Sequence, residues 1–98
     1  MNTTKIKLVQ KTYSTDSIGQ KIALEEKHEV FADVMSITAK EFANAGILGL
    51  KPKYEFRVWL AEYNNEEFVD YNGKRFKVYR TYAQGNGRIE LYGEEVQV

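Results

Sequence analysis

The side chains that could do acid–base or metal chemistry in this chain are few and scattered. The only histidine, His28, lies in the charged run Glu25–Glu29, which is typical of a solvated surface. A catalytic base needs a nucleophile and an orienting group, and the sequence indicates neither of them. Asp16, Asp33 and Asp70 do not form a metal-ligand spacing, and there is no cysteine. The sequence therefore predicts no catalytic residue, metal site or cofactor, and no enzymatic activity.

Adjacent glutamates and a glycine pair are the remaining motifs with possible chemistry. The glutamate pairs are Glu25-Glu26, Glu66-Glu67 and Glu94-Glu95. Neighbouring strand residues face opposite ways, so these carboxylates are not expected to converge and are predicted to be solvated. Gly85-Asn86-Gly87 lacks the spacing of a phosphate-binding loop and is interpreted as a hairpin turn.

Length and charge limit the class of protein. The 98 residues predict one domain, residues 1–98, with 43% apolar residues to build its core. Fourteen basic residues balance fourteen acidic ones, whereas proteins that grip phosphate backbones usually carry a basic excess. No apolar run reaches the roughly 20 residues that span a bilayer, and the first residues do not resemble a signal peptide. We therefore expect no membrane association.

Alternating apolar and polar residues predict strands throughout the second half of the chain. The predicted strands are 54–61, 68–71, 75–82 and 88–96. Asn72-Gly73 predicts a two-residue hairpin turn, because both residues tolerate positive φ. The residues expected to face the core are Tyr54, Phe56, Val58, Leu60, Phe76, Val78 and Tyr82.

The first half predicts shorter elements. Residues 5–9 are expected to form an edge strand, because lysines alternate with Ile6 and Leu8. Residues 14–19 are turn formers, residues 22–24 indicate a short strand, and residues 30–37 a longer one whose core face is Val30, Ala32 and Val34. The prediction is a mainly β fold, a small antiparallel barrel or sandwich of about six strands with one short helix.

That helix is predicted over Thr38–Ala45. Thr38 and Glu41 form a capping box, Phe42 is expected to pack it down, and Gly46 is the expected left-handed terminator. About two turns of helix do not persist alone in water, so packing or a neighbouring subunit must hold them.

An apolar, glycine-containing segment follows the helix. It comprises Gly46, Ile47, Leu48, Gly49, Leu50, Lys51, Pro52 and Lys53. One interpretation is a loop whose aliphatic residues tuck under the core. The other is a mobile loop that meets a partner, with two glycines lowering the cost of movement.

Aromatic residues off the main core face are candidates for contacts with other molecules. Trp59, Tyr79 and Tyr92 could anchor a subunit interface, or cover a second side of the core. Arg75, Lys77 and Tyr79 share one predicted face, and basic residues among aromatics can bind single-stranded nucleic acid. A small nucleic-acid-binding barrel is therefore the alternative function.

The ordered succession of motifs resembles the tailed-phage head-closure proteins, also called head–tail joining or stopper proteins. The motifs are Glu41-Phe42-Ala43-Asn44-Ala45-Gly46, Lys51-Pro52, an aromatic-rich strand, Asn72-Gly73-Lys74, Arg80-Thr81-Tyr82 and Glu90-Leu91-Tyr92. With the opening strand and turn, the resemblance begins near Lys5 and covers nearly the whole chain.

The resemblance implies a structural role in the virion. Such proteins form a ring, usually taken to be a dodecamer, with copies of themselves below the phage portal and adaptor proteins, and members can be monomers until they meet that template. The ring helps to retain packaged DNA, which passes through without sequence recognition, and it offers a surface to tail or tail-completion proteins. In some members a loop closes the channel, and residues 46–53 are the candidate here. The implied location is the virion, after assembly in the cytoplasm of a bacterial host, from a phage or prophage.

Overall fold

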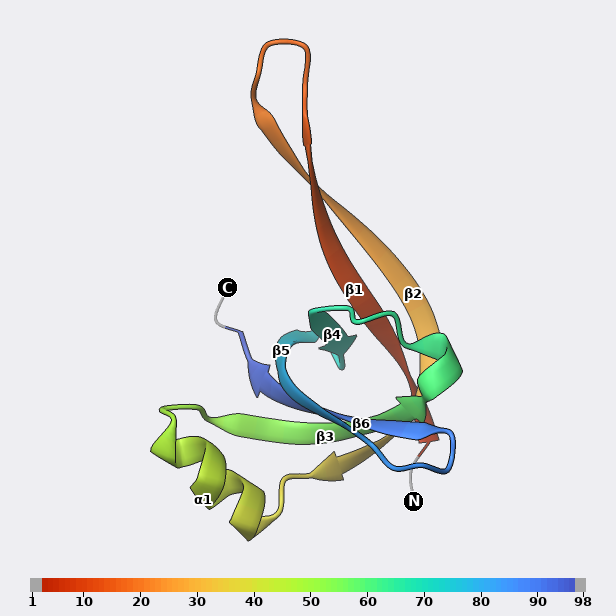
Figure 1. Ribbon diagram of the computed structural model, residues 1–98, viewed down its shortest axis with the longest axis vertical. Helices are drawn as coiled ribbons and strands as arrows, with labels where there is room; N and C mark the ends of the chain where they lie inside the picture. Colours follow the sequence, from red (N-terminus) through yellow and green to blue (C-terminus); the bar gives the residue numbers. More distant parts are fainter. Residues whose placement is uncertain (1–2, 97–98) are drawn as a thin grey trace.

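Six strands and two short helices make up the computed structural model, which describes residues 3–96 (Figure 1). The strands are β1 (Thr3–Thr15), β2 (Lys21–Ser36), β3 (Pro52–Trp59), β4 (Phe68–Tyr71), β5 (Lys74–Ala83) and β6 (Arg88–Glu95). The helices are α1 (Ala39–Ile47), which follows β2, and the single 3-10 turn η1 (Leu60–Glu62), which follows β3.

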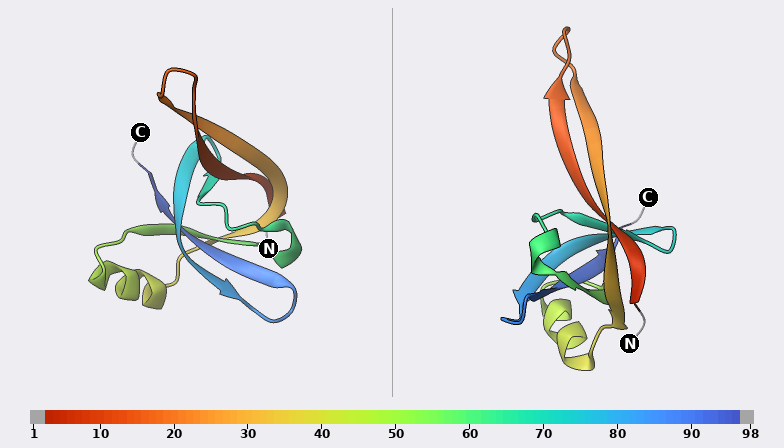
Figure 2. Two further views of the ribbon diagram at one scale, coloured as in Figure 1. Left: turned by 45° about the horizontal axis from the view of Figure 1, so that its top comes forward. Right: turned by 90° about the vertical axis from the view of Figure 1, so that its right-hand side faces the viewer.

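The strands close into an antiparallel barrel. Their order is β1-β2-β3-β6-β5-β4, and β4 pairs back onto β1 from Lys7–Asp70 to Val9–Phe68 (Figure 2). The mainly β prediction is confirmed, and the barrel replaces the sandwich alternative. The prediction that residues 5–9 form an edge strand is wrong, because β1 has a partner on both sides there.

Tight turns join the strands of the second half. Asn72 and Gly73 have φ of 53° and 77° and alone separate β4 from β5, so the two-residue hairpin is confirmed. Positive φ at both central residues is typical of a type I′ turn, whose twist matches that of the strands.

The core contains one inward-facing set of side chains from all six strands. Its buried members are Ile6, Leu8, Val30, Ala32, Phe56, Val58, Val69, Phe76, Ile89 and Leu91. Tyr54 and Tyr71 are half-buried and contact this cluster, with edge-on ring contacts at centroid distances of 5.4 to 5.7 Å to each other and to the two phenylalanines.

A glycine of β6 is required by this aromatic packing. A Cβ built on Gly93 would lie 3.1 Å from a ring carbon of Phe56 and 3.1 Å from the Cβ of Phe76. Its φ is not in the left-handed region, so space is the reason for glycine here.

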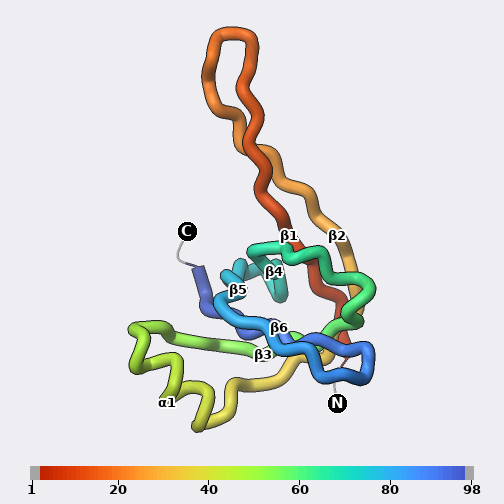
Figure 3. The backbone as a smooth tube through the Cα atoms, in the orientation of Figure 1, coloured from red at the N-terminus to blue at the C-terminus, as the bar shows by residue number. Residues whose placement is uncertain are grey.

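The first two strands extend far beyond the barrel as a twisted ribbon (Figure 3). β1 and β2 pair continuously from Thr3–Asp33 to Thr15–Lys21, with a turn at residues 16–20. Among the described residues, those from 10 to 29 pair only within this ribbon, which we call the arm. The predicted break between a short strand at 22–24 and another at 30–37 is therefore wrong. Polar residues 25–29 continue the strand, because both of their faces lie outside the barrel.

Helix α1 begins as predicted but ends later. Thr38 caps it, and its hydroxyl accepts the Glu41 N–H at 3.2 Å. Gly46 is helical, and the left-handed terminator is Gly49, with φ of 78°. The predicted end at Ala45 is wrong because Gly46 and Ile47 complete the last turn.

Three predicted core contacts are also wrong, since Phe42, Leu60 and Tyr82 are exposed. Leu60 begins η1, so the alternation of β3 stops before it. A bulge between Val78 and Arg80 shifts the alternation of β5 and turns Tyr82 outward.

Candidate partner-binding surfaces

The apolar segment after α1 is held in a hydrogen-bonded turn. The Leu50 N–H donates to the Ala45 carbonyl and the Gly49 N–H to the Gly46 carbonyl, both at 3.0 Å. This pair of bonds is a Schellman motif, and it satisfies the last carbonyls of the helix. The predicted loop comprised residues 46–53. Residues 46–47 belong to α1 and residues 52–53 to β3, so the connection between the two elements is residues 48–51. The interpretation as one mobile loop is therefore wrong in its boundaries.

The turn presents two aliphatic side chains to solvent. Ile47 is 83% exposed and Leu48 76%, whereas Leu50 is half-buried and Pro52 is buried. The Lys51 N–H donates to Glu94 at 3.3 Å, which ties the base of the turn to β6. Ile47 and Leu48, which we call the helix knob, thus form an apolar projection on an ordered backbone.

Trp59 is the one predicted contact aromatic that is clearly exposed, at 51%. The Arg88 guanidinium lies 4.4 Å from its ring centroid, and the Leu60 N–H donates to the Gly87 carbonyl beside it at 2.8 Å. A shallow, mainly apolar hollow lies here, lined by Trp59, Leu60, Ala61, Glu62 and Gly87. We call it the Trp59 hollow.

Tyr79 and Tyr92 instead lie against each other on the barrel wall, and Tyr79 also contacts α1. Tyr92 is only 8% exposed, so its predicted exposure is wrong, and its ring contacts that of Tyr79 at 6.4 Å. The Tyr79 hydroxyl donates to Glu41 of α1 at 2.8 Å, and Arg80 pairs with the same carboxylate. Burial raises the pKa of both tyrosines, so both hydroxyls stay protonated as donors. The alternative interpretation, a second covered side of the core, describes these two residues.

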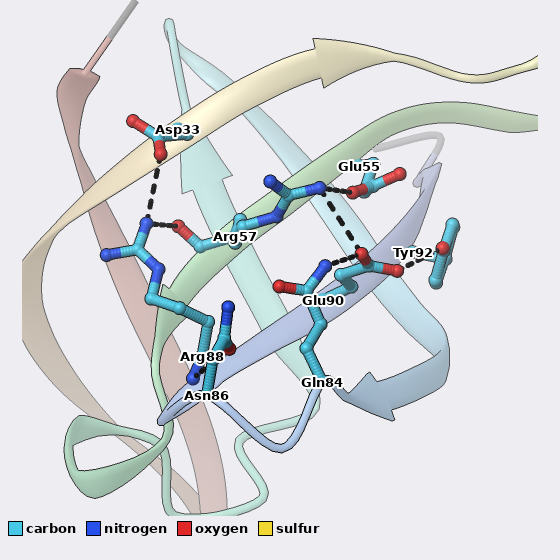
Figure 4. Close-up of polar contacts among 8 residues, drawn as sticks. All are labelled: Asp33, Glu55, Arg57, Gln84, Asn86, Arg88, Glu90 and Tyr92. Carbon is cyan, nitrogen blue, oxygen red and sulfur yellow. Dashed lines mark hydrogen bonds and ion pairs between the residues drawn. The ribbon is translucent and has the colours of Figure 1, made fainter. Parts of the chain in front are cut away.

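A polar network covers the outer face of β3 and β6 (Figure 4). Arg57 donates to Glu55 at 3.2 Å and to Glu90 at 3.3 Å, and Glu90 also accepts from Gln84. The Tyr92 hydroxyl donates to Glu90 at 2.5 Å. Burial, and then the nearby Glu90 carboxylate, raises the pKa of Glu55. Two carboxylates thus share one guanidinium, and the network links neighbouring positions on the outer face of β3 and β6.

A second branch of the same network joins β6 to β2. Arg88 donates to the Asp33 carboxylate at 3.0 Å and to the Arg57 carbonyl at 3.2 Å, and its N–H is accepted by Asn86 at 3.1 Å. The bond to Asn86 thereby fixes the loop between β5 and β6, whose Gly87 lines the Trp59 hollow.

One of the glutamates predicted to be solvated is buried. Glu66 is 6% exposed, and its carboxylate accepts the Asn64 N–H at 2.6 Å. Its backbone carbonyl accepts the Tyr63 hydroxyl at 3.0 Å. Burial, with a smaller effect of Glu66, raises the pKa of Tyr63 to about 12. The carboxylate thus organises the connection between η1 and β4.

The arm is the surface that sequence reasoning missed. Cross-strand partners lie on the same face of a sheet. The pairs Thr12–Leu24 and Ser14–Ile22 lie on the face of the arm that continues from the core-facing side of β1 and β2. Ile22 is 42% and Leu24 51% exposed, and Ile18 is exposed at the tip. The available signal was the spacing of Ile22 and Leu24, which Glu26 and His28 interrupt before Val30.

Ion pairs fix the base of the arm to the barrel. Arg75 of β5 binds Glu25 of the arm at 2.6 Å and Asp70 of β4 at 2.7 Å, and Lys27 lies 3.6 Å from Asp70. Hydrogen bonds from Arg75 lower the pKa of both carboxyls. The same contacts occupy Arg75, and Tyr79 is bound to Glu41, so the predicted nucleic-acid face retains only Lys77 fully exposed.

The described part of the chain contains neither a metal-ligand cluster nor a membrane-spanning helix. Between residues 3 and 96, no three or more His, Cys, Asp or Glu side chains are grouped to hold a metal ion. Within the same range, neither helix has the length and apolar character needed to cross a membrane. His28 is exposed on the arm, as predicted.

Comparison with known proteins adds no identification. No model of a known protein family matches the chain. No curated protein matches it either. The resemblance to head-closure proteins therefore stays a prediction from the sequence.

Proposed function

We propose that this protein is a structural subunit of the head–tail connector of a phage or prophage. It forms a ring with copies of itself below the portal and adaptor, helps to close the DNA channel after packaging, and presents a surface to the tail. The observation that carries the proposal is the presence of separate apolar projections, the helix knob and the arm, on one small barrel.

The energetics of these projections favour a subunit over a free-standing protein. Ile47 and Leu48 are more than three-quarters exposed on a backbone that is already ordered by hydrogen bonds. Burying each aliphatic side chain contributes about 1.5–3 kcal/mol, and an ordered turn loses little further entropy on binding. A subunit in a stack of rings needs contacts to copies beside it and to other proteins above and below, which requires several such surfaces.

The helix knob is our candidate for the part that meets its symmetry mates at the axis or contacts the neighbouring ring. We expect Ile47→Ser combined with Leu48→Ser to leave the isolated subunit folded, because both side chains are exposed. The same double variant should impair DNA retention or tail joining. The matched control is Ala39→Ser with Lys40→Ser, which changes two exposed positions at the other end of α1.

The experiment combines a melting curve of each isolated variant with electron microscopy of the subunit added to the upstream connector ring. Rings formed by the control and by the wild type, with incomplete closure in the knob variant, would support the proposal. If no ring forms with the wild-type protein, the connector function is wrong. If phage particles that carry the knob variant are fully infectious, the helix knob is only a connection between α1 and β3.

Binding to single-stranded DNA separates this function from the alternative. We expect weak, salt-sensitive binding, because the charges balance and Arg75 is engaged in ion pairs. Fluorescence anisotropy with a labelled oligonucleotide tests this, and tight binding at physiological salt would favour the nucleic-acid-binding barrel.

A further inference from the structure

The arm and the Trp59 hollow are two apolar surfaces of opposite shape. The arm is a narrow ribbon that carries Ile18, Ile22 and Leu24 into solvent. The hollow is a shallow depression whose lining is mainly apolar, with Trp59 and Leu60 both exposed. A protruding aliphatic surface and a concave aromatic one are complementary in shape and in polarity.

The two surfaces do not meet within one chain. The arm projects away from the barrel along the longest axis of the molecule. Helix η1, which lines the hollow, lies on the barrel itself (Figures 1 and 2). Ion pairs of Arg75 with Glu25 and Asp70 hold the base of the arm in this outward direction. The complement of each surface must therefore be supplied by another molecule.

We propose that the arm of one copy docks into the Trp59 hollow of a second copy. The face that carries Ile22 and Leu24 covers the exposed Trp59 and Leu60, and Ile18 packs at the rim. This inference rests on the proposed function, in which copies of the protein form a closed ring. It identifies the two surfaces through which neighbouring subunits of that ring contact each other.

The charges beside the two surfaces are also complementary. Lys21 flanks the arm's aliphatic residues and Glu62 lines the hollow. Within residues 3–96 neither of them forms an ion pair in the single chain. Arg88, which lies over the Trp59 ring, is already paired with Asp33, so Glu62 is the charge of the hollow that a docked Lys21 would meet.

Such a contact is heterologous, because a copy's arm binds a different surface on its neighbour. Repeated head-to-tail contacts generate a ring when the rotation closes and a filament when it does not. Among residues 3–96, the outer edge of β1 has no strand partner after Val9, and that of β2 has none before Asp33. Pairing between two arms is therefore the competing arrangement.

Single cysteines distinguish these arrangements, because the natural chain has none. Ile22→Cys and Leu60→Cys are made as separate proteins, one of them with a size tag, and mixed under a mild oxidant at high protein concentration. Docking should make the tagged–untagged disulfide form at least about tenfold faster than in a control mixture, because a docked pair has a high effective concentration. The control replaces Leu60→Cys with Lys40→Cys on the exposed face of α1.

Each outcome decides the proposal. A mixed disulfide well above the control supports arm-to-hollow docking. Faster self-pairing of Ile22→Cys would show arm-to-arm contact, and equal rates in both mixtures would show that the hollow binds something else, so either result overturns it. Reduced protein must melt like the wild type, and Leu24→Cys serves as a second arm variant if Ile22→Cys does not fold.

Failure of this contact is distinguishable from failure of the connector function. If the disulfide forms but the protein never assembles on the upstream connector ring, the arm-to-hollow interface is correct and the connector function is wrong. If wild-type rings assemble and the mixed disulfide stays at the control rate inside them, the function stands and the interface falls.

Discussion

Replacing Gly93 with alanine tests how tightly the barrel core is packed. The new methyl group would lie 3.1 Å from the Phe56 ring and 3.1 Å from the Phe76 Cβ. A ring can rotate slightly, but a Cβ moves only with its backbone, and Phe76 is fixed in the sheet between β4 and β6. The strain therefore falls on the register of β5 against β6, where the Val78–Arg80 bulge already lies.

The magnitude follows from two opposing effects. Overpacking of a core costs about 1–3 kcal/mol. Restricting the unfolded chain by a Gly-to-Ala change returns about 0.4–1 kcal/mol, because the position does not need positive φ. We expect a net loss of about 1.3 kcal/mol in the free energy of unfolding, which is the difference between the midpoints of these two ranges. Each 1 kcal/mol lowers the melting midpoint of such a domain by roughly 4–8 °C.

Gly46→Ala is the matched control in the same chain. Gly46 lies in the last turn of α1, and its Cβ would meet no atom within 4 Å. Alanine there should stabilise the protein by about 0.5–1 kcal/mol. Thermal and urea unfolding followed by circular dichroism measure both variants. If Gly93→Ala melts at or above the wild-type midpoint, the argument from core space is wrong.

Three further changes have opposite or pH-dependent effects. Gly73→Val should cost about 1 kcal/mol or more, because a β-branched residue resists the φ of 77° at the turn, and an unchanged urea midpoint would contradict this. Glu55→Gln should stabilise the protein at neutral pH but not in acid below the ordinary Glu pKa. The reason is that the raised pKa of Glu55 makes its charged form the less stable one in the folded state; equal effects at both pH values would count against it. Arg75→Gln should remove part of the acid sensitivity of stability. Arg75 lowers the pKa of Asp70, and that stabilisation is present above the unfolded pKa and lost as the pH falls through the folded one; an acid-unfolding curve with the wild-type slope would refute it.

The sequence was sufficient where local rules act alone. Asn72-Gly73 predicted its hairpin because positive φ is a property of those two residues. Val30 and Ala32 were placed correctly because the alternation of a strand with one buried face can be read directly. Thr38 was recognised as the helix cap from its spacing to Glu41.

The elements that were predicted wrongly depend on tertiary structure, which the alternation of apolar and polar residues does not reveal. Polar residues 25–29 looked like a break, because a strand exposed on both faces has no apolar signal. Gly46 looked like the terminator, although Gly49 three residues later makes the same turn with φ of 78°. Tyr92 looked like a surface aromatic, but Tyr79 and Arg80 of the neighbouring strand β5 lie against its ring, and these are tertiary contacts.

Strand β2 runs without a break from the tip of the arm to Ser36, two residues before α1 begins at its cap Thr38. An extended chain advances about 3.3 Å per residue, and successive side chains point to opposite faces. A change in strand length therefore keeps every side chain on its face only when it involves an even number of residues. Removing one residue from each arm strand would shorten the reach and also turn Ile22 to the opposite side. Removing two from each would shorten it by about 7 Å and keep every face in place. The span of this subunit can therefore be adjusted only in even steps, by engineering or by evolution.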